Sequence, residues 1–291
     1  MCYHTQIQVN NNLIHGGSPI NRDRLSYKWS KLLYDEFFIL LRSNSVSMSL
    51  VHELEKSGNW LFRRRSWLPV VILVPAIIWL FIANRSVIYF NYTWEIICIL
   101  VSVAGELVRS FTVGYVPRNT SGRNVIDQLA DELNTTGIYS IVRNPLYLGN
   151  FLMWLGPVMF LRSVWCLIIF ILAFWLYYER IIFAEEQYLR RKFGETYDIW
   201  AFRVKAVIPS LKHYKKPALP FSFRNVLKRE HNSVANLFIV FAILDTVRNI
   251  AVTGRVYMEP LYVTLLVAAG IFWAVVRYLV KRTSFLYVDG R

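Results

Sequence analysis

The sequence predicts an all-α, polytopic integral membrane protein with about six transmembrane helices. Of its 291 residues, 55% are hydrophobic and 16% are aromatic, and the mean hydropathy of +0.34 is too high for an ordinary soluble domain. Six apolar segments each approach the roughly 20 residues that a helix needs to cross a bilayer. Basic residues gather at the ends of these segments, where the positive-inside rule places them.

The formal net charge of +14 does not indicate a nucleic-acid partner, because the basic residues do not follow a groove-tracking face. The three cysteines, Cys2, Cys98 and Cys166, are far apart and show no metal-ligand spacing. We therefore expect neither nucleic acid nor a metal ion as a partner.

The first 65 residues are interpreted as a cytosolic N-terminal extension. Residues 1–24 are rich in Asn, Gly and Ser, which predicts poor order, and no signal peptide is visible. From Ser26 to Glu55, apolar residues recur at three- and four-residue spacing, which predicts an amphipathic helix. That helix either lies on the membrane or packs on the cytosolic face of the protein itself.

Six segments are predicted to span the membrane: Trp67–Asn84, Tyr92–Arg109, Leu146–Leu161, Ser163–Phe183, Val234–Val252 and Leu261–Val280. The third and fourth segments form a tight hairpin, and the third is short. The triplet Arg63–Arg65 predicts a cytoplasmic N-terminus. Residues 110–145, residues 184–232 and the C-terminus then also lie on the cytoplasmic side. Separately, we expect the membrane to be a bacterial inner membrane. The expected parts after the extension are a first hairpin (66–110), a core (111–210), a linker (211–232) and a C-terminal hairpin with a tail (233–291).

Two pairs of opposite charges lie within the predicted spans. Glu106 and Arg109 are three residues apart, as are Asp245 and Arg248, so the members of each pair can meet on one helix face. Paired charges inside a membrane usually face the interior of a helix bundle. Structural pairing is therefore expected for Asp245–Arg248, whereas Glu106–Arg109 has either a structural or a functional role.

The stretch YSIVRNPLYLGN, residues 139–150, places a polar and aromatic cluster at the start of the third span. Pro145 favours the first helical position and disfavours helix at Asn144. The free amides of a helix start, with Arg143 beside them, suit a carboxylate or a phosphate. Tyr139 and Tyr147 offer flat surfaces for stacking. The alternative is an interfacial belt of aromatic and arginine side chains.

The stretch EEQYLRRKFGETYDIW, residues 185–200, continues the fourth span as a helix. Glu185 and Glu186 diverge by about one hundred degrees, so at most one of them points into a pocket. A solvated amphipathic helix is the alternative for this stretch taken alone.

Taken together, GIYSIVRNPLYLGN, a hydrophobic hairpin, EEQYLRRKFGETYDIW and the closing Val207-Ile208-Pro209 resemble the isoprenylcysteine carboxyl methyltransferase and phospholipid methyltransferase superfamily. The resemblance implies an integral membrane methyltransferase that binds S-adenosylmethionine in a pocket on the cytosolic side. Carried over by position, it implies that the following residues contact the cofactor: Leu133, Asn134, Tyr139, Asn144, Pro145, Leu146, Tyr147 and Glu185.

Two positions depart from the family pattern. Asn144 replaces the usual histidine and cannot carry a proton near neutral pH, which argues against a general base there. Ile181 occupies the place of the arginine that binds the substrate carboxylate in the isoprenylcysteine enzymes, and the nearest arginine is Arg180.

We expect Arg143 to position an anion, and Glu186 or Arg180 to serve the substrate side. Arg118 and Arg123, in the loop 114–124, are predicted to bind an anionic head group, with a non-specific contact to the lipid surface as the alternative. The predicted substrate is a membrane lipid or a lipidated molecule with a phosphate or carboxylate acceptor. The alternatives are an NADPH-dependent membrane reductase of the sterol type and a non-enzymatic scaffold or transporter.

Overall fold

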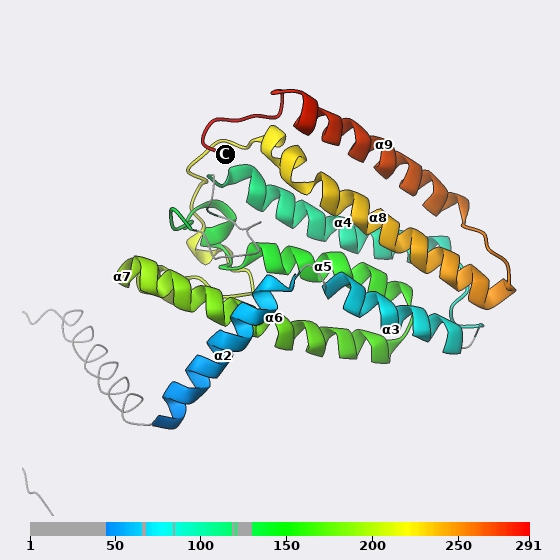
Figure 1. Ribbon diagram of the computed structural model, residues 1–291, viewed down its shortest axis with the longest axis horizontal. Helices are drawn as coiled ribbons and strands as arrows, with labels where there is room; N and C mark the ends of the chain where they lie inside the picture. The colour runs from blue at the N-terminus through cyan, green and yellow to red at the C-terminus, as the bar shows by residue number, and fades with distance from the viewer. Residues whose placement is uncertain (1–44, 66–67, 84, 118–119, 121–129) are drawn as a thin grey trace, which may run out of the picture. The chain divides into compact units, whose positions relative to one another are not determined.

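A computed structural model describes residues 45–65, 68–83, 85–117, 120 and 130–291 (Figure 1). All regular structure in these ranges is helical, which confirms the predicted all-α class. The chain divides into two units, residues 1–52 and 53–291, and the contacts described below lie within the second unit. Most of the predicted amphipathic helix lies outside the described residues, but its last part is found in α2 (Ser45–Arg63), which runs beyond Glu55.

Within the described ranges, seven further α-helices follow α2: α3 (Leu68–Ile82), α4 (Tyr92–Tyr115), α5 (Pro145–Phe160), α6 (Val164–Phe193), α7 (Glu195–Arg203), α8 (Phe223–Thr253) and α9 (Pro260–Arg282). The short 3₁₀ helices η2 (Gly137–Ser140) and η3 (Leu211–His213) lie in the connections. Among the described residues, α4, α6, α8 and α9 are long and apolar enough to cross a membrane, so the protein is a multi-pass membrane protein. The helices at the first and third predicted spans, α3 and α5, have 15 and 16 residues, and the count of six spans stays a prediction.

Local sequence explains where the helices begin. The side chains of Asn91, Ser163 and Ser222 each accept a hydrogen bond from a backbone N–H in the first turn of α4, α6 and α8. Pro145 is the first residue of α5, as the sequence predicts. Gly254 ends α8 in the left-handed conformation, which glycine adopts without a steric penalty.

The short helix α5 ends among other helices, where its last carbonyls need partners. The indole N–H of Trp94 in α4 donates to the carbonyl of Met159, and that of Trp79 in α3 donates to the carbonyl of Leu161, both at 3.1 Å. The Met159 carbonyl also accepts a hydrogen bond from the backbone N–H of Arg162, so the two indoles tie the C-terminal end of α5 to α3 and α4.

Small residues allow α4 and α5 to pack closely. A Cβ atom on Gly105 would lie 2.5 Å from the carbonyl oxygen of Gly149, and Ser102 donates a 2.9 Å hydrogen bond to the carbonyl of Met153. Figure 1 shows α5 against α4, and α4, α8 and α9 side by side. The family-like segments thus lie in the same bundle as the C-terminal hairpin α8–α9.

Two ion pairs join α4 to α8. The predicted Asp245–Arg248 pair is confirmed, and Glu95 of α4 joins it at 2.6 Å from Arg248. Arg109, by contrast, forms its ion pair with Glu230 of α8 at 2.7 Å. Sequence spacing identified the i,i+3 partner in the first case but not the partner from a distant helix in the second.

Candidate active site

The Arg143–Pro145 bend lies directly against the polar end of α6. Arg143 Nη2 is 2.9 Å from the Glu186 carboxylate, and both side chains are partly buried. Because α5 begins at this bend and Glu186 follows the apolar part of α6, the ion pair fixes the two family-like segments beside one another.

The chain after α6 folds back over the bend. The indole N–H of Trp200 in α7 donates to the carbonyl of Tyr139 at 3.2 Å, and Arg143 Nη1 donates to the carbonyl of Ala201 at 2.6 Å. The backbone N–H groups of Arg143 and Asn144 donate to the carbonyls that follow α7, those of Lys205 and Ala206. These two amides, which lie just before the first turn of α5, are therefore occupied by the protein's own backbone.

Asn144 also uses its side chain in this closure. Its Nδ2 donates to the carbonyl of Ala206 at 3.1 Å, and it makes no side-chain cap for α5. The residue that replaces the family histidine thus holds the chain after α7, a task that needs a donor but no titratable group.

Glu185 lies in the polar extension of α6, beyond Phe183 and outside the membrane-spanning part of the helix. Burial raises the pKa of its carboxyl group from 4.5 to about 7, and the neighbouring Glu186 raises it further, while a hydrogen bond from Tyr147 and the charge of Arg65 lower it. A cation that binds next to such a buried carboxyl group stabilises its ionised form.

Tyr139 is the second aromatic residue beside Glu185. Burial raises the pKa of the Tyr139 hydroxyl; the charge of Arg229 in α8 opposes this shift, and that of Glu185 adds to it. The Tyr139 hydroxyl therefore stays neutral, and it lies within electrostatic range of both Arg229 and Glu185.

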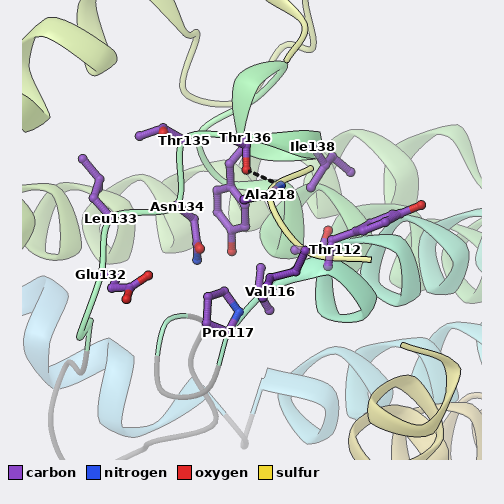
Figure 2. Close-up of a pocket in the computed structure, with 13 residues that line it drawn as sticks. Thr112, Val116, Pro117, Glu132, Leu133, Asn134, Thr135, Thr136, Ile138 and Ala218 are labelled. Atoms are coloured by element: carbon purple, nitrogen blue, oxygen red, sulfur yellow. Dashed lines mark hydrogen bonds between the residues drawn. The ribbon is translucent and has the colours of Figure 1, made fainter. Parts of the chain in front are cut away.

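A pocket of about 150 Å³ adjoins Tyr139. Figure 2 shows its two sides, residues 132–136 facing Thr112, Val116 and Pro117 at the end of α4, with Ala218 held by Thr136. The pocket is smaller than the ~300 Å³ at which sites for drug-sized ligands begin, so these walls suit one end of such a ligand. Asn134 also binds the carbonyl of Thr120 through its Nδ2 at 3.0 Å.

The predicted cofactor residues fall into three groups. Leu133, Asn134 and Tyr139 line the pocket, and Tyr139 and Tyr147 lie close to Glu185. Asn144, Pro145 and Leu146 form the start of α5, where Pro145 is buried.

The predicted substrate residues are more scattered. Arg180 is exposed on α6, whereas its neighbour Ile181 is fully buried in an aromatic cluster. Arg118 and Arg123 lie outside the described residues.

Several residues near Glu185 were not singled out from the sequence for this site. Arg65, at the end of the extension, acts electrostatically on Glu185, Tyr147 and Tyr178. The ring of Tyr178 lies 4.7 Å from that of Tyr147, and Asn150 donates to the Tyr178 hydroxyl at 3.3 Å. Asn150 and Tyr178, polar side chains within apolar spans, were the available signal, because such residues are costly unless they are used.

Comparison with known proteins gives a consistent result. Residues 94–196 match the family model described as phospholipid methyltransferase. The protein-S-isoprenylcysteine O-methyltransferase of Schizosaccharomyces pombe is 38% identical over 26% of this chain and 33% of its own length. The enzyme of the same name from Tribolium castaneum is 28% identical over 40% of this chain and 41% of its own length, and that from Xenopus laevis is 28% identical over 62% of each chain.

These alignments leave more than a third of each relative uncovered. No solved structure matches the chain. The matched segment runs from α4 to the start of α7 and contains the bend, the hairpin and the twin glutamates. This segment is therefore similar to the phospholipid methyltransferase family and to isoprenylcysteine O-methyltransferases.

Proposed function

We propose that this protein is an S-adenosylmethionine-dependent methyltransferase that acts at the cytosolic membrane face on an oxygen atom of a lipid or lipidated substrate. The observation that carries the proposal is the hydrogen bond between Tyr147 and Glu185 beside the Arg143–Glu186 ion pair, with Tyr139 within electrostatic range of Glu185. The matched family segment contains all five residues, and the relatives named above are isoprenylcysteine O-methyltransferases.

The groups around Glu185 fit the amino-acid end of such a cofactor. The Glu185 carboxylate suits an ammonium group, and its raised pKa means that a bound cation stabilises the ionised form. Arg143 Nε is buried and has no hydrogen-bond partner among the described residues, so it remains available to a carboxylate. Tyr139 and Tyr147 offer aromatic faces for a sulfonium or an adenine ring.

The chemistry requires positioning more than proton transfer. When bound, S-adenosylmethionine supplies a methyl group, whose bond to sulfur breaks as a bond to the acceptor oxygen forms. A carboxylate or phosphate oxygen is already nucleophilic at neutral pH, so the protein needs to hold the acceptor in line and exclude water. Asn144 cannot act as a general base, which agrees with an acceptor that has no proton to lose.

On the substrate side, Arg65 is the cation whose charge lowers the pKa of Glu185. The Arg65 guanidinium suits an anionic acceptor group. Ile181, which stands at the position of the family's substrate-binding arginine, has no charge and cannot bind such a group. Glu186 and Arg180, together with Arg118 and Arg123 of the loop, remain predicted substrate residues, with Glu186 also holding Arg143 in place.

A methyl-transfer assay tests the proposal. The purified protein in lipid nanodiscs receives methyl-labelled S-adenosylmethionine with one of three acceptors: farnesylcysteine, a lipid phosphate monoester or an ethanolamine lipid. We expect label in the carboxylate or the phosphate product, and much less with Glu185→Gln. Label in the amine alone would contradict the oxygen acceptor, and label in none of the three would contradict the proposed function.

A further inference from the structure

A continuous row of polar side chains crosses the helix bundle from the C-terminal hairpin to the candidate active site. We call it the polar chain, and its members, in spatial order, are Glu230, Arg109, Asn150, Tyr178, Tyr147 and Glu185. They come from α8, α4, α5, α6, α5 and α6. Glu230 lies outside the segment that matches the family model, so this end of the chain is not part of the shared core.

Arg109 is the centre of the first half. Its Nη2 and Nε donate to one oxygen of Glu230 at 2.7 and 3.0 Å, and its Nη1 donates to Asn150 Oδ1 at 2.5 Å. The Glu230 side chain is 4% exposed and that of Arg109 18%. A buried carboxylate thus compensates the charge of an arginine that also has to serve Asn150.

Arg109 sets the direction of the next bond. An arginine has no acceptor, so it faces the carbonyl oxygen of Asn150 and turns the amide nitrogen toward Tyr178. Asn150 Nδ2 then donates to the Tyr178 hydroxyl oxygen at 3.3 Å. The hydrogen of that hydroxyl is directed away from Asn150 as a consequence.

Tyr178 in turn supports the residues next to the cofactor position. Tyr178 and Glu185 are seven residues apart on α6, about two turns, and share one face of the helix. Tyr147 reaches between them from α5, with its ring 4.7 Å from that of Tyr178 and its hydroxyl hydrogen-bonded to Glu185. Phe174 stacks on Tyr178 at 4.2 Å, which further restricts that ring.

Gly149 provides the space that this arrangement needs. A Cβ atom at this position would lie 2.5 Å from Arg109 Cγ, so Arg109 crosses α5 where the helix has no side chain. The single glycine of the YSIVRNPLYLGN stretch therefore has a specific partner from α4.

We propose that Arg109 and Asn150 are positioning residues: they hold Tyr178, and through it Tyr147, so that Glu185 is oriented to bind the ammonium group of the cofactor. Glu230 completes the arrangement, which makes the C-terminal hairpin part of the site. This inference rests on the proposed function, and it gives α8 a role in cofactor binding through Glu230.

Titration of the purified full-length protein with S-adenosylhomocysteine tests the inference. Asn150→Asp keeps an oxygen for Arg109 but replaces the donor to Tyr178 with an acceptor, so the bond to Tyr178 can form only in the reversed direction; Tyr178→Phe removes the hydroxyl altogether. We expect each variant, and Glu230→Gln, to bind about tenfold more weakly, the effect of losing about one buried hydrogen bond. The double variant Asn150→Asp/Tyr178→Phe is expected to bind no more weakly than either single one, because both changes break the same link.

Ser102→Ala is the matched control. It removes a buried hydrogen bond between α4 and α5 without touching the polar chain, so it is expected to lower the melting temperature and leave the affinity unchanged. Melting curves of all variants separate loss of the fold from loss of binding, and the isosteric Glu230→Gln decides the matter if another variant does not fold.

Two results would overturn the inference while leaving the proposed function intact: wild-type affinity in the three single variants, or losses that multiply in the double variant. A wild-type protein that does not bind S-adenosylhomocysteine would overturn the proposed function, and the inference with it.

Discussion

Glu185 owes its properties to its surroundings more than to its residue type. Burial raises its pKa to about 7, whereas Glu186, one residue later, forms an ion pair with Arg143. Two adjacent carboxylates on one helix thus have different partners, as their divergence around the helix axis predicts.

Cofactor affinity is expected to depend on pH through Glu185. Because burial raises its pKa to about 7, the free protein carries this group largely protonated at pH 6 and largely ionised at pH 8. Only the ionised form attracts an ammonium group, so S-adenosylhomocysteine should bind about tenfold more tightly at pH 8 than at pH 6. Isothermal titration at several pH values measures this, and Glu185→Gln should abolish the dependence. An equal dependence in both proteins would exclude Glu185 as its source.

At the same scale, the motif does not show all of the contacts that its residues make. Arg143 lies at the bend, yet one guanidinium nitrogen donates to a carbonyl within α7 and its backbone N–H donates to a carbonyl just after α7. A sequence pattern shows which residues are brought together by the local bend. It does not show which backbone carbonyls return to that bend some sixty residues later.

At the scale of the elements, the close contact of α4 with α5 depends on glycine. Gly149→Ala would place a Cβ atom 2.5 Å from Arg109 Cγ and 2.9 Å from the carbonyl of Gly105. We expect a loss of about 1–3 kcal/mol in the free energy of unfolding, typical of overpacking, with weaker cofactor binding. Gly270→Ala in α9 is the control: nothing lies within 4 Å of its new Cβ atom, so it should be neutral or stabilising. Denaturation in mixed detergent compares the two, and equal stabilities would contradict the packing argument.

The buried cluster around Arg248 links α4 to α8. Arg248→Met would leave the carboxylates of Glu95 and Asp245 without their cation. The expected loss is about 3–5 kcal/mol, as for a buried ion pair that loses one partner. Arg277→Met on α9 removes an arginine that lies over Trp273 and should cost less than about 1 kcal/mol. Similar melting temperatures for the two variants would show that the cluster does not stabilise the fold.

Hydropathy located the helices well and their ends less well. The predicted span at Ser163–Phe183 is the apolar part of α6, which continues to Phe193 because the polar residues beyond it also favour helix. The indoles of Trp79 and Trp94 donate to carbonyls at the C-terminal end of α5 from other helices. Contacts of this kind depend on packing and leave no local pattern in the sequence.

At the scale of the molecule, we propose that the candidate active site faces the cytoplasm, together with both termini. In a background without Cys2, Cys98 and Cys166, single cysteines at the exposed positions Arg255 and Lys212 report the two sides. A membrane-impermeant maleimide added to intact cells should label Arg255→Cys, and should label Lys212→Cys only after the membrane is opened. Reversed labelling would place the site on the outer face.

The sequence predicts that the bend and the twin glutamates lie together, and the Arg143–Glu186 ion pair and the Tyr147–Glu185 hydrogen bond join these segments. The roles of Tyr139, Tyr147 and Glu185 in cofactor binding stay predictions. The contribution of α8 through Glu230 was not predictable, because nothing in the local sequence links it to Arg109, 121 residues earlier.

The central claim is that a nucleoside sulfonium cofactor is held between the Arg143–Pro145 bend and the polar end of α6. Titration of the purified protein with S-adenosylhomocysteine at pH 8 tests it most directly, with Glu185→Gln beside Glu179→Gln, an exposed carboxylate on the same helix. The account predicts saturable binding to the wild type and to Glu179→Gln, and binding at least about tenfold weaker to Glu185→Gln. No binding to the wild type, or equal binding to all three proteins, would contradict it.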